Sequence, residues 1–336
     1  MRAVKLGGGQ AGGMNVVELA EPSAAGRAVV VRVRAASLNF RDAMIAAGHY
    51  PGISVAGLVP LSDGAGEIVG VGDDVTRFKS GDRVTISCMP RWVSGPLEQR
   101  YALEQYGVTI DGMLADYVVV DEEGLIALPE ALSFEDGACL PCAALTAWTA
   151  LTDSRPLLPG QSVLTLGTGS VSLFAAQFAK MFGARVIATT STAQKGQRLK
   201  ALGVDEIINY RETPNWEKAV LDLTDGTGVD RVVEVGGGNT IGKSVAATRL
   251  GGYIGLIGFV AGFGGALDPL SIITGNVTLA GVGMGSRLDL EALVAAMAAH
   301  SSHAVIDSAF DFEDHAAAYA RLAASDRFGK TVITLG

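Results

Sequence analysis

The stretch from Ser162 to Thr190 decides the fold, and it reads SVLTLGTGSVSLFAAQFAKMFGARVIATT. It opens with the apolar run Val163–Leu166, passes through a glycine turn, and then carries apolar residues at helical spacing over about 171–182. A second β-rich run follows at Val186–Thr189. This order predicts a βαβ unit, whose strands lie parallel in a sheet that helices cover on both faces.

The glycine turn, GTGSVS at 167–172, predicts a dinucleotide site. In such turns the first glycine makes the tight turn, the second lets the backbone approach a pyrophosphate, and the third position needs a small side chain. Ser172 stands in that third position. Free N–H groups at the start of the following helix bind phosphate, although a mere tight turn is the alternative interpretation. The expected cofactor contacts here are Gly167, Thr168, Gly169, Ser170 and Val171.

The residues at the end of the second strand indicate whether the site binds NADH or NADPH. NAD sites usually carry an acidic residue about 20 residues after the glycine turn. Here the strand ends in ATTS at 188–191, without an acid, and Lys195 and Lys200 follow. Hydroxyl groups and an ammonium suit a 2′-phosphate, so NADPH is favoured over NADH, with contacts from Thr190, Ser191 and Lys195. An exposed lysine on a helix face is the alternative for Lys195.

The α/β pattern continues toward the C-terminus. Further strands are expected at Glu206–Ile208, Arg231–Val235, Tyr253–Ile257 and Val277–Val282, and helices near 194–202 and 241–249. Two of these strands end in glycine-containing turns at the carboxyl edge, where such sheets bind ligands. We expect Gly236 and Gly258 to let the dinucleotide lie close to the backbone, with contacts from Ile257 and Phe259.

The first third of the chain has a different pattern. Short β-rich runs at Ala28–Val33, Glu67–Val71, Arg83–Ser87 and Tyr117–Val120 are separated by turn signals, which predicts a small antiparallel barrel or sandwich. The C-terminus adds expected helices near 290–300 and 313–324 and a closing strand at Thr331–Thr334.

Composition excludes several classes of protein. The 336 residues suffice for two domains of ~100–200 residues each, and 26 Lys and Arg against 35 Asp and Glu give a net charge of −9. This charge, without basic runs, argues against a nucleic-acid surface. Three cysteines and an N-terminus without an apolar signal segment favour the reducing cytoplasm. The uncharged stretch Leu250–Leu267 holds seven glycines, so it is interpreted as a buried strand and loop, not a membrane helix.

Eight motifs in a fixed order extend over nearly the whole chain: LNFRD at 38–42, DGAGEIV at 63–69, FKSGDRV at 78–84, LPCAALTAW at 140–148, GTGSVS at 167–172, INYR at 208–211, VVEVGG at 232–237 and FGK at 328–330. Together they resemble the medium-chain dehydrogenase/reductase superfamily, in particular its zinc-independent, quinone-oxidoreductase-like branch. The resemblance implies an α/β architecture: a GroES-like catalytic domain (1–128 and 286–336) and an inserted Rossmann domain with a doubly wound parallel sheet (129–285). It also implies an active site in the cleft between these two domains and cofactor contacts from Thr146 and Tyr210.

The resemblance also bears on metal content. Zinc members of the superfamily bind catalytic zinc through a cysteine, a histidine often followed by glutamate, and a second cysteine. The matching positions here hold Asn39, Ser62 beside Asp63, and Cys142, and no cysteine lies between 88 and 113 where the structural zinc lobe would be. A catalytic zinc needs three protein ligands and an open position. We therefore expect no zinc, and Cys142 is interpreted as a small buried hydrophobe.

Without zinc, reduction of an activated C=C bond or a quinone is easier than alcohol oxidation, which needs a group to bind the developing alkoxide. The resemblance implies that Asn39 and Tyr50 orient substrate or donate hydrogen bonds and that Asp42 supports them, although Asp42 could instead pair with Arg41 or cap a helix. The expected function is NADPH-dependent reduction of quinones or α,β-unsaturated carbonyls, a small-molecule reaction without membrane or nucleic acid.

Three further expectations remain open. Two of them are alternative functions. The protein could be a zinc-free NADP-dependent alcohol dehydrogenase or ketone reductase, or a cofactor-binding protein with little catalysis. The strand at 277–282 resembles the edge strand through which family members pair their sheets, so a homodimer is expected.

Overall fold

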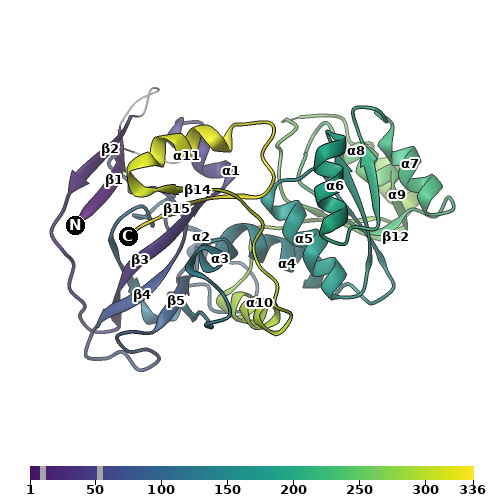
Figure 1. Ribbon diagram of the computed structural model, residues 1–336. Helices are drawn as coiled ribbons and strands as arrows, with labels where there is room; N and C mark the ends of the chain where they lie inside the picture. The colour runs from purple at the N-terminus through teal and green to yellow at the C-terminus, as the bar shows by residue number, and fades with distance from the viewer. Residues whose placement is uncertain (8–12, 51–55, 263) are drawn as a thin grey trace. The chain divides into compact units, whose positions relative to one another are not determined.

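The computed structural model describes residues 1–7, 13–50, 56–262 and 264–336 (Figure 1). The chain forms two compact units. We call Met1–Leu145 with Gly285–Gly336 the antiparallel unit, and Thr146–Met284 the parallel-sheet unit.

The division falls later in the chain than the expected boundary at 129, because the next segment packs on strands of the antiparallel unit. Helix α3 (Phe134–Ala138) contacts β3 (Ala28–Leu38) and β4 (Asp63–Val71). The Ser37 hydroxyl donates to the Ala138 carbonyl over 2.6 Å, and the Thr85 hydroxyl donates to the Gly137 carbonyl over 2.8 Å. These buried hydrogen bonds hold α3 to the antiparallel unit.

The parallel-sheet unit contains six strands in the order β10-β9-β8-β11-β12-β13, every neighbouring pair parallel. The strands are β8 (Ser162–Thr165), β9 (Arg185–Thr190), β10 (Glu206–Asn209), β11 (Val229–Glu234), β12 (Thr248–Leu256) and β13 (Thr278–Gly281). The predicted βαβ unit is confirmed. The chain starts at β8 and builds outward in both directions, which places a topological switch beside β8, where such sheets bind ligands.

Helices connect these strands. They are α4 (Leu145–Thr152), α5 (Ser170–Met181), α6 (Ala193–Ala201), α7 (Trp216–Leu223), α8 (Ile241–Ala246) and α9 (Pro269–Gly275). Helix α5 packs on β8 and β9, α6 packs on β9 and β10, and α8 contacts both α7 and α9. Because helices cover the sheet, β9 is buried at every position after Arg185.

The uncharged stretch 250–267 is half strand and half loop, as the sequence predicts. Its first part belongs to β12, and the described residues after Leu256 form turns and irregular chain. Within the described residues, no helix has both the length and the apolar character needed to cross a membrane.

In the antiparallel unit, β3 is the central strand. The sheet order is β14-β15-β3-β4-β5-β7, with β6 also paired to β3, and β1 and β2 form a separate pair. The strands are β1 (Arg2–Leu6), β2 (Met14–Glu18), β3, β4, β5 (Arg83–Ile86), β6 (Tyr117–Asp121), β7 (Leu125–Ala127), β14 (Ile306–Asp311) and β15 (Lys330–Thr334). Pairing is antiparallel except between β14 and β15. The sheet thus brings the C-terminal strand β15 against β3.

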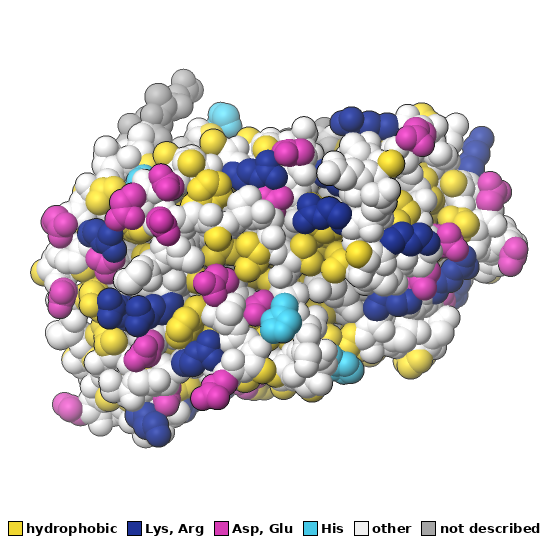
Figure 2. Space-filling model, in the orientation of Figure 1, with side chains coloured by type: hydrophobic (Ala, Val, Ile, Leu, Met, Phe, Trp, Pro, Cys, Tyr) yellow, Lys and Arg dark blue, Asp and Glu magenta, His cyan; other side chains and the backbone are white. Residues whose placement is uncertain are grey.

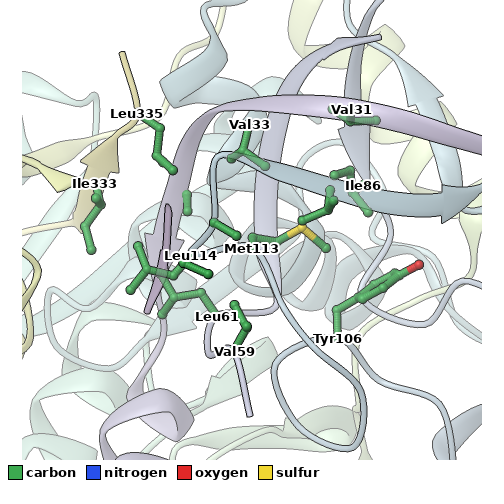
Figure 3. Close-up of a cluster of buried hydrophobic side chains, with 14 of the residues drawn as sticks. Val31, Val33, Val59, Leu61, Ile86, Tyr106, Met113, Leu114, Ile333 and Leu335 are labelled. Carbon is green, nitrogen blue, oxygen red and sulfur yellow. The ribbon is translucent and has the colours of Figure 1, made fainter. Parts of the chain in front are cut away.

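Helices and single helical turns complete this unit. They are α1 (Phe40–Ala46), α2 (Gln99–Ala102), α3, α10 (Arg287–Ala299) and α11 (His315–Leu322), with the 3-10 turns η1 (Glu122–Gly124) and η3 (Phe312–Asp314) and the π-helical turn η2 (Leu140–Ala144). Figure 3 shows the apolar core, in which Met113 and Leu114 lie among side chains from β3, β5 and β15. On the face drawn in Figure 2, cationic and anionic side chains are interspersed, in agreement with the absence of basic runs in the sequence.

Candidate functional site

The turn after β8 has the geometry of a phosphate-binding loop. Gly167 has φ of +73°, a conformation that favours glycine, and its N–H donates to the Thr189 hydroxyl over 3.1 Å. Gly169 is the N-cap of α5, and no heavy atom lies within 4 Å of the place where its Cβ would stand. Open space thus adjoins the N-cap of a 12-residue helix, whose first N–H groups could hold the pyrophosphate of a dinucleotide.

Ser172 occupies the third glycine position for a structural reason. Its side chain is buried, and its hydroxyl donates to the Leu166 carbonyl over 2.6 Å. The hydroxyl therefore joins the first turn of α5 to the end of β8. Thr168 is buried in the same turn, while Ser170 and Val171 form the first turn of the helix.

The residues expected to favour NADPH over NADH lie at the end of β9. Thr190 is buried and Ser191 half-buried, and the Thr192 hydroxyl accepts the Lys195 N–H over 3.3 Å at the start of α6. The Lys200 ammonium donates to the Asp205 carbonyl over 2.7 Å, so it is held at the far end of that helix. Lys195 is half-buried and lies one turn from the strand end.

A hollow of about 650 Å³ adjoins the same strand end. Its lining includes Thr190, Thr192, Gly196, Asn209 and Thr213. Tyr210, which follows β10, is 40% exposed, and its N–H donates to the Thr190 carbonyl over 2.9 Å. The expected cofactor contacts Thr190 and Tyr210 are therefore brought together, although 20 residues separate them.

Gly236 and Gly258 need to be glycine because of the protein's own packing. A Cβ on Gly236 would lie 2.2 Å from the Thr240 Oγ1, and one on Gly258 would lie 2.8 Å from the Val235 carbonyl oxygen. Both contacts are too close for any side chain. The chain's own atoms therefore account for these two glycines, and close approach of a dinucleotide is not needed to explain them.

Glu234 organises this glycine loop, and the sequence analysis did not single it out as a site residue. The buried carboxylate accepts the N–H groups of Gly236 over 2.7 Å and Gly237 over 3.0 Å, and the Thr240 hydroxyl over 2.7 Å. The Ser244 hydroxyl donates to its second oxygen. The available signal was an acid at the end of a strand, two residues before a run of three glycines.

The other expected cofactor residues lie in the same unit. Ile257 and Phe259 follow β12, and the Ile257 N–H donates to the Glu234 carbonyl over 2.8 Å. Thr146 is buried in the first turn of α4. The structure therefore places Ile257 beside the Glu234 loop at the carboxyl edge.

The antiparallel unit holds a second group of polar side chains, centred on Asn39. The Lys330 ammonium donates to the Leu38 carbonyl and to the Asn39 Oδ1, each over 2.9 Å, and lies 3.6 Å from the Asp63 Oδ2. The side chains of Lys330 and Asp63 are both fully buried. Lys330 lies in the FGK motif at 328–330, and nothing local in the sequence indicates that its side chain is buried.

Arg41 and Ser62 extend this polar cluster. The Arg41 Nη2 donates to the Ser62 hydroxyl over 2.7 Å, and that hydroxyl donates to the Asp63 Oδ1 over 2.7 Å. Two buried donors here, Asn39 Nδ2 and Arg41 Nε, have no hydrogen-bond partner. The acceptors Asp42 Oδ1 and Asp63 Oδ2 also accept no hydrogen bond, although Asp63 Oδ2 is ion-paired with Lys330. Buried polar atoms are usually satisfied, so unpaired ones in a single cluster indicate a place where a ligand binds.

Asp42 is a helix cap in this structure. Its Oδ2 accepts the Asn39 N–H over 2.6 Å at the start of α1. Burial raises the pKa of Asp42 to about 6, although the charge of Arg41 opposes this shift. Of the alternatives open for Asp42, the hydrogen bonding therefore supports the cap, which holds Asn39 in place.

Tyr50 lies in a different environment. Its side chain is half-buried and packs against Leu6, Ile45 and Val108. The five residues that follow it lie outside the described residues. The structure therefore brings Asn39 and Asp42 together and places Tyr50 against an apolar cluster.

Comparison with known proteins agrees with both units. The family described as "Alcohol dehydrogenase GroES-like domain" matches residues 25–130, and the family described as "Zinc-binding dehydrogenase" matches residues 170–299. A zinc-type alcohol dehydrogenase-like protein of Schizosaccharomyces pombe is 39% identical over 313 residues, which cover 91% of this chain and 90% of that protein. The chain belongs to the medium-chain dehydrogenase/reductase superfamily.

Other members of the superfamily have related but distinct names. A quinone oxidoreductase of Pseudomonas aeruginosa is 31% identical over 344 residues, covering 96% of each chain. A crystal structure described as an NAD-dependent alcohol dehydrogenase is 34% identical, with a TM-score of 0.90 and full coverage of both chains. The expected fold class, a GroES-like unit and a Rossmann-like parallel-sheet unit, is confirmed, and the protein is an oxidoreductase of this superfamily.

Proposed function

We propose that this protein is an NADPH-dependent reductase of quinones or α,β-unsaturated carbonyl compounds that works without zinc. The observation that carries the proposal is the Asn39 Nδ2, a buried donor without a partner. When bound, the nicotinamide supplies a hydride, and negative charge then moves to the carbonyl oxygen of the substrate. A donor fixed in place stabilises such charge.

Lys330 sets the direction of the Asn39 amide. An ammonium can only donate hydrogen bonds, so the atom it contacts at 2.9 Å must be the amide oxygen. The amide nitrogen is thereby left as a donor for substrate. The Asp42 carboxylate, which accepts the Asn39 N–H, fixes the backbone of the same residue.

The residues at the former ligand positions do not fit a catalytic zinc. Two cations contact them: Lys330 lies against Asn39 and Asp63, and Arg41 donates to Ser62. A zinc ion would need three such donors free of cations. In the described part of the chain, no three His, Cys, Asp or Glu side chains gather as a possible metal site.

An Asn39→Asp variant tests the donor directly, because aspartate has nearly the same shape but a carboxylate cannot donate. We expect kcat for an enone or quinone to fall ~100-fold, while the Kd for NADPH stays unchanged. An unchanged kcat would show that the Asn39 amide does not stabilise charge in the reaction.

Substrate profiling separates the proposal from its enzymatic rival. The name of the Schizosaccharomyces pombe relative favours alcohol dehydrogenase or ketone reductase activity as the second candidate. Purified protein should oxidise NADPH with enones or quinones. Turnover of secondary alcohols with NADP⁺, without any enone or quinone activity, would support the rival, and no turnover with any acceptor would indicate a cofactor-binding protein.

Cofactor choice rests on the chemistry of the β9 end. Thr190, Ser191 and Lys195 offer hydroxyl groups and a cation, which favour a 2′-phosphate, whereas one solved relative is described as NAD-dependent. We expect Lys195→Ala to lower the preference for NADPH over NADH, measured as a ratio of kcat/KM values, about tenfold. Lys200→Ala is the control, because its ammonium binds the Asp205 carbonyl. An unchanged ratio in Lys195→Ala would contradict the assignment.

We also propose a cytoplasmic homodimer. The three cysteines are thiols and not disulfides, which fits a reducing compartment. Strand β13, within the predicted 277–282, ends the parallel sheet, and the nearby helix α9 exposes Leu270 and Ile273. Pairing with a second copy would cover this edge. Sedimentation of dilute protein should give a dimer, and a monomer alone would refute it.

A further inference from the structure

The Arg41 guanidinium is a cation whose hydrogen bonds go to neutral groups. Its Nη2 donates to the Ser62 hydroxyl over 2.7 Å, and its Nη1 donates to the Gln105 amide oxygen over 3.4 Å. Its Nε is buried and has no hydrogen-bond partner. Charged side chains that are withdrawn from water are usually paired with an opposite charge. One donor of this guanidinium is therefore left for a group that a ligand can supply.

The acids around Arg41 are engaged elsewhere. Asp63 is connected to Arg41 through the Ser62 hydroxyl, which donates to Asp63 Oδ1 over 2.7 Å. The other oxygen of Asp63 lies 3.6 Å from the Lys330 ammonium. Asp42 caps α1 by accepting the Asn39 N–H. Each acid thus has its own role in the fold, and a hydroxyl group stands between Arg41 and Asp63.

Arg41 and Asn39 belong to one polar cluster. Asn39 is 7% exposed, and its Nδ2 is the second buried donor without a partner. Lys330 contacts both Asn39 and Asp63, and Ser62 joins Asp63 to Arg41. An amide N–H is neutral and suits a carbonyl oxygen, whereas a guanidinium suits a carboxylate. The two free donors therefore match two different acceptor groups of one ligand.

We propose that the substrate of this reductase carries a carboxylate, which Arg41 binds, in addition to the carbonyl group that Asn39 binds. The substrate class is then that of oxo-enoic acids, of which 4-oxo-2-pentenoate is a small example. Ser62 and Gln105 hold the other donors of Arg41, so the guanidinium is positioned before the substrate arrives. The role of Asn39 rests on the proposed function, whereas carboxylate binding by Arg41 does not.

A matched pair of substrates tests the proposal. 4-Oxo-2-pentenoate and its methyl ester have the same enone and differ in charge, and their kcat/KM values with NADPH give an acid-to-ester ratio. We expect Arg41→Gln to lower this ratio at least tenfold relative to the wild-type protein, because only the acid loses a charge-assisted hydrogen bond. Comparing the two proteins cancels the difference in intrinsic reactivity between acid and ester. An equal loss for both substrates would overturn the proposal.

Two further variants keep this test decisive. Arg91→Gln is the matched control, because Arg91 is 70% exposed and pairs with Glu104 over 2.6 Å, and its acid-to-ester ratio should be that of the wild-type protein. Arg41→Lys keeps the positive charge if Arg41→Gln does not fold. Lysine lacks the planar guanidinium, so the ratio should fall severalfold. An unchanged ratio in Arg41→Lys would contradict recognition by the guanidinium.

Calorimetric titration measures the carboxylate site without turnover. The complex with NADP⁺ cannot reduce 4-oxopentanoate, the saturated acid, so its Kd reports binding alone. We expect the methyl ester to bind the wild-type protein at least tenfold more weakly than the acid, and the acid to bind Arg41→Gln at least tenfold more weakly than the wild-type protein.

The titration also separates the two proposals. If the acid binds through Arg41 but no enone or quinone is reduced, the carboxylate site stands and the proposed function fails. If enones or quinones are reduced but acid and ester bind equally in both proteins, the carboxylate site is refuted and the proposed function stands.

Discussion

The glycine loop of the parallel-sheet unit and the Asn39 cluster of the antiparallel unit are built in different ways. The loop uses backbone N–H groups and the conformation of Gly167 within six consecutive residues. The cluster uses side chains from four separate segments, among them the C-terminal strand that carries Lys330. A backbone site is thus defined locally, whereas a side-chain cluster depends on the complete fold of its unit. Variants can test whether the two sites differ in this way.

The largest effect is expected at Lys330. Lys330→Met removes a fully buried cation and leaves the buried Asp63 without its ion-pair partner, which should lower the free energy of unfolding by about 3–5 kcal/mol. Denaturant unfolding measures it. The control is Lys180→Met, whose ammonium pairs with Asp205 at 2.8 Å but is one-third exposed, and which should cost less than about 1 kcal/mol. Equal losses would show that the Lys330 pair does not stabilise the cluster.

Asp42 should make stability depend on pH. Its pKa is about 6 in the folded protein against an ordinary 3.8, so the folded state holds the proton more tightly. The stability this gives is complete below pH 3.8 and is lost as the pH rises through 6. Between pH 3 and 7, the wild-type free energy of unfolding should therefore fall by about 3 kcal/mol relative to Asp42→Asn. Parallel curves for the two proteins would contradict this, and exposed Asp73→Asn is the control.

Gly169→Val tests the glycine loop without disturbing the fold. The new side chain would point into the open space where we place the pyrophosphate, so the Kd for NADPH should rise ~100-fold, or about 2.7 kcal/mol. Thermal unfolding should stay unchanged. Gly283→Val also adds a side chain in open space and should leave the Kd unaltered. Normal NADPH binding by Gly169→Val would show that the loop does not hold phosphate.

The smallest effect is expected at Ser172. Ser172→Ala loses the buried hydrogen bond to the Leu166 carbonyl, which should cost about 1 kcal/mol of unfolding free energy without weakening NADPH binding. In the exposed helix α9, Thr274→Ala loses a similar bond of 2.8 Å to the Leu270 carbonyl and should cost less. A marked loss of NADPH affinity in Ser172→Ala would mean that the hydroxyl belongs to the cofactor site.

Sequence patterns predicted the parallel sheet because their rules act over short distances. Strand β8, helix α5 and strand β9 each lie within two residues of their expected bounds. Strands β1, β2 and β14 were not predicted, because their sequences carry no clear strand pattern; β1 and β2 pair with each other, and β14 pairs with β15. Tertiary packing explains the domain boundary, since only the contacts of α3 with β3 show that residues 129–145 belong with the antiparallel unit.

By itself, the sequence determined the superfamily, the α/β architecture and the glycine turn, because motifs and hydrophobic periodicity encode backbone structure directly. Only the tertiary structure decided that Gly236 and Gly258 are needed for internal packing, that Glu234 holds their loop, and that Lys330 orients Asn39. Lys330 and Asn39 are distant in the chain and meet only when the strands pair, and the contact of Gly258 with Val235 depends on the pairing of β11 with β12. The Glu234 hydrogen bonds span only two to ten residues, but they depend on the folded course of the glycine loop, which no local pattern specifies.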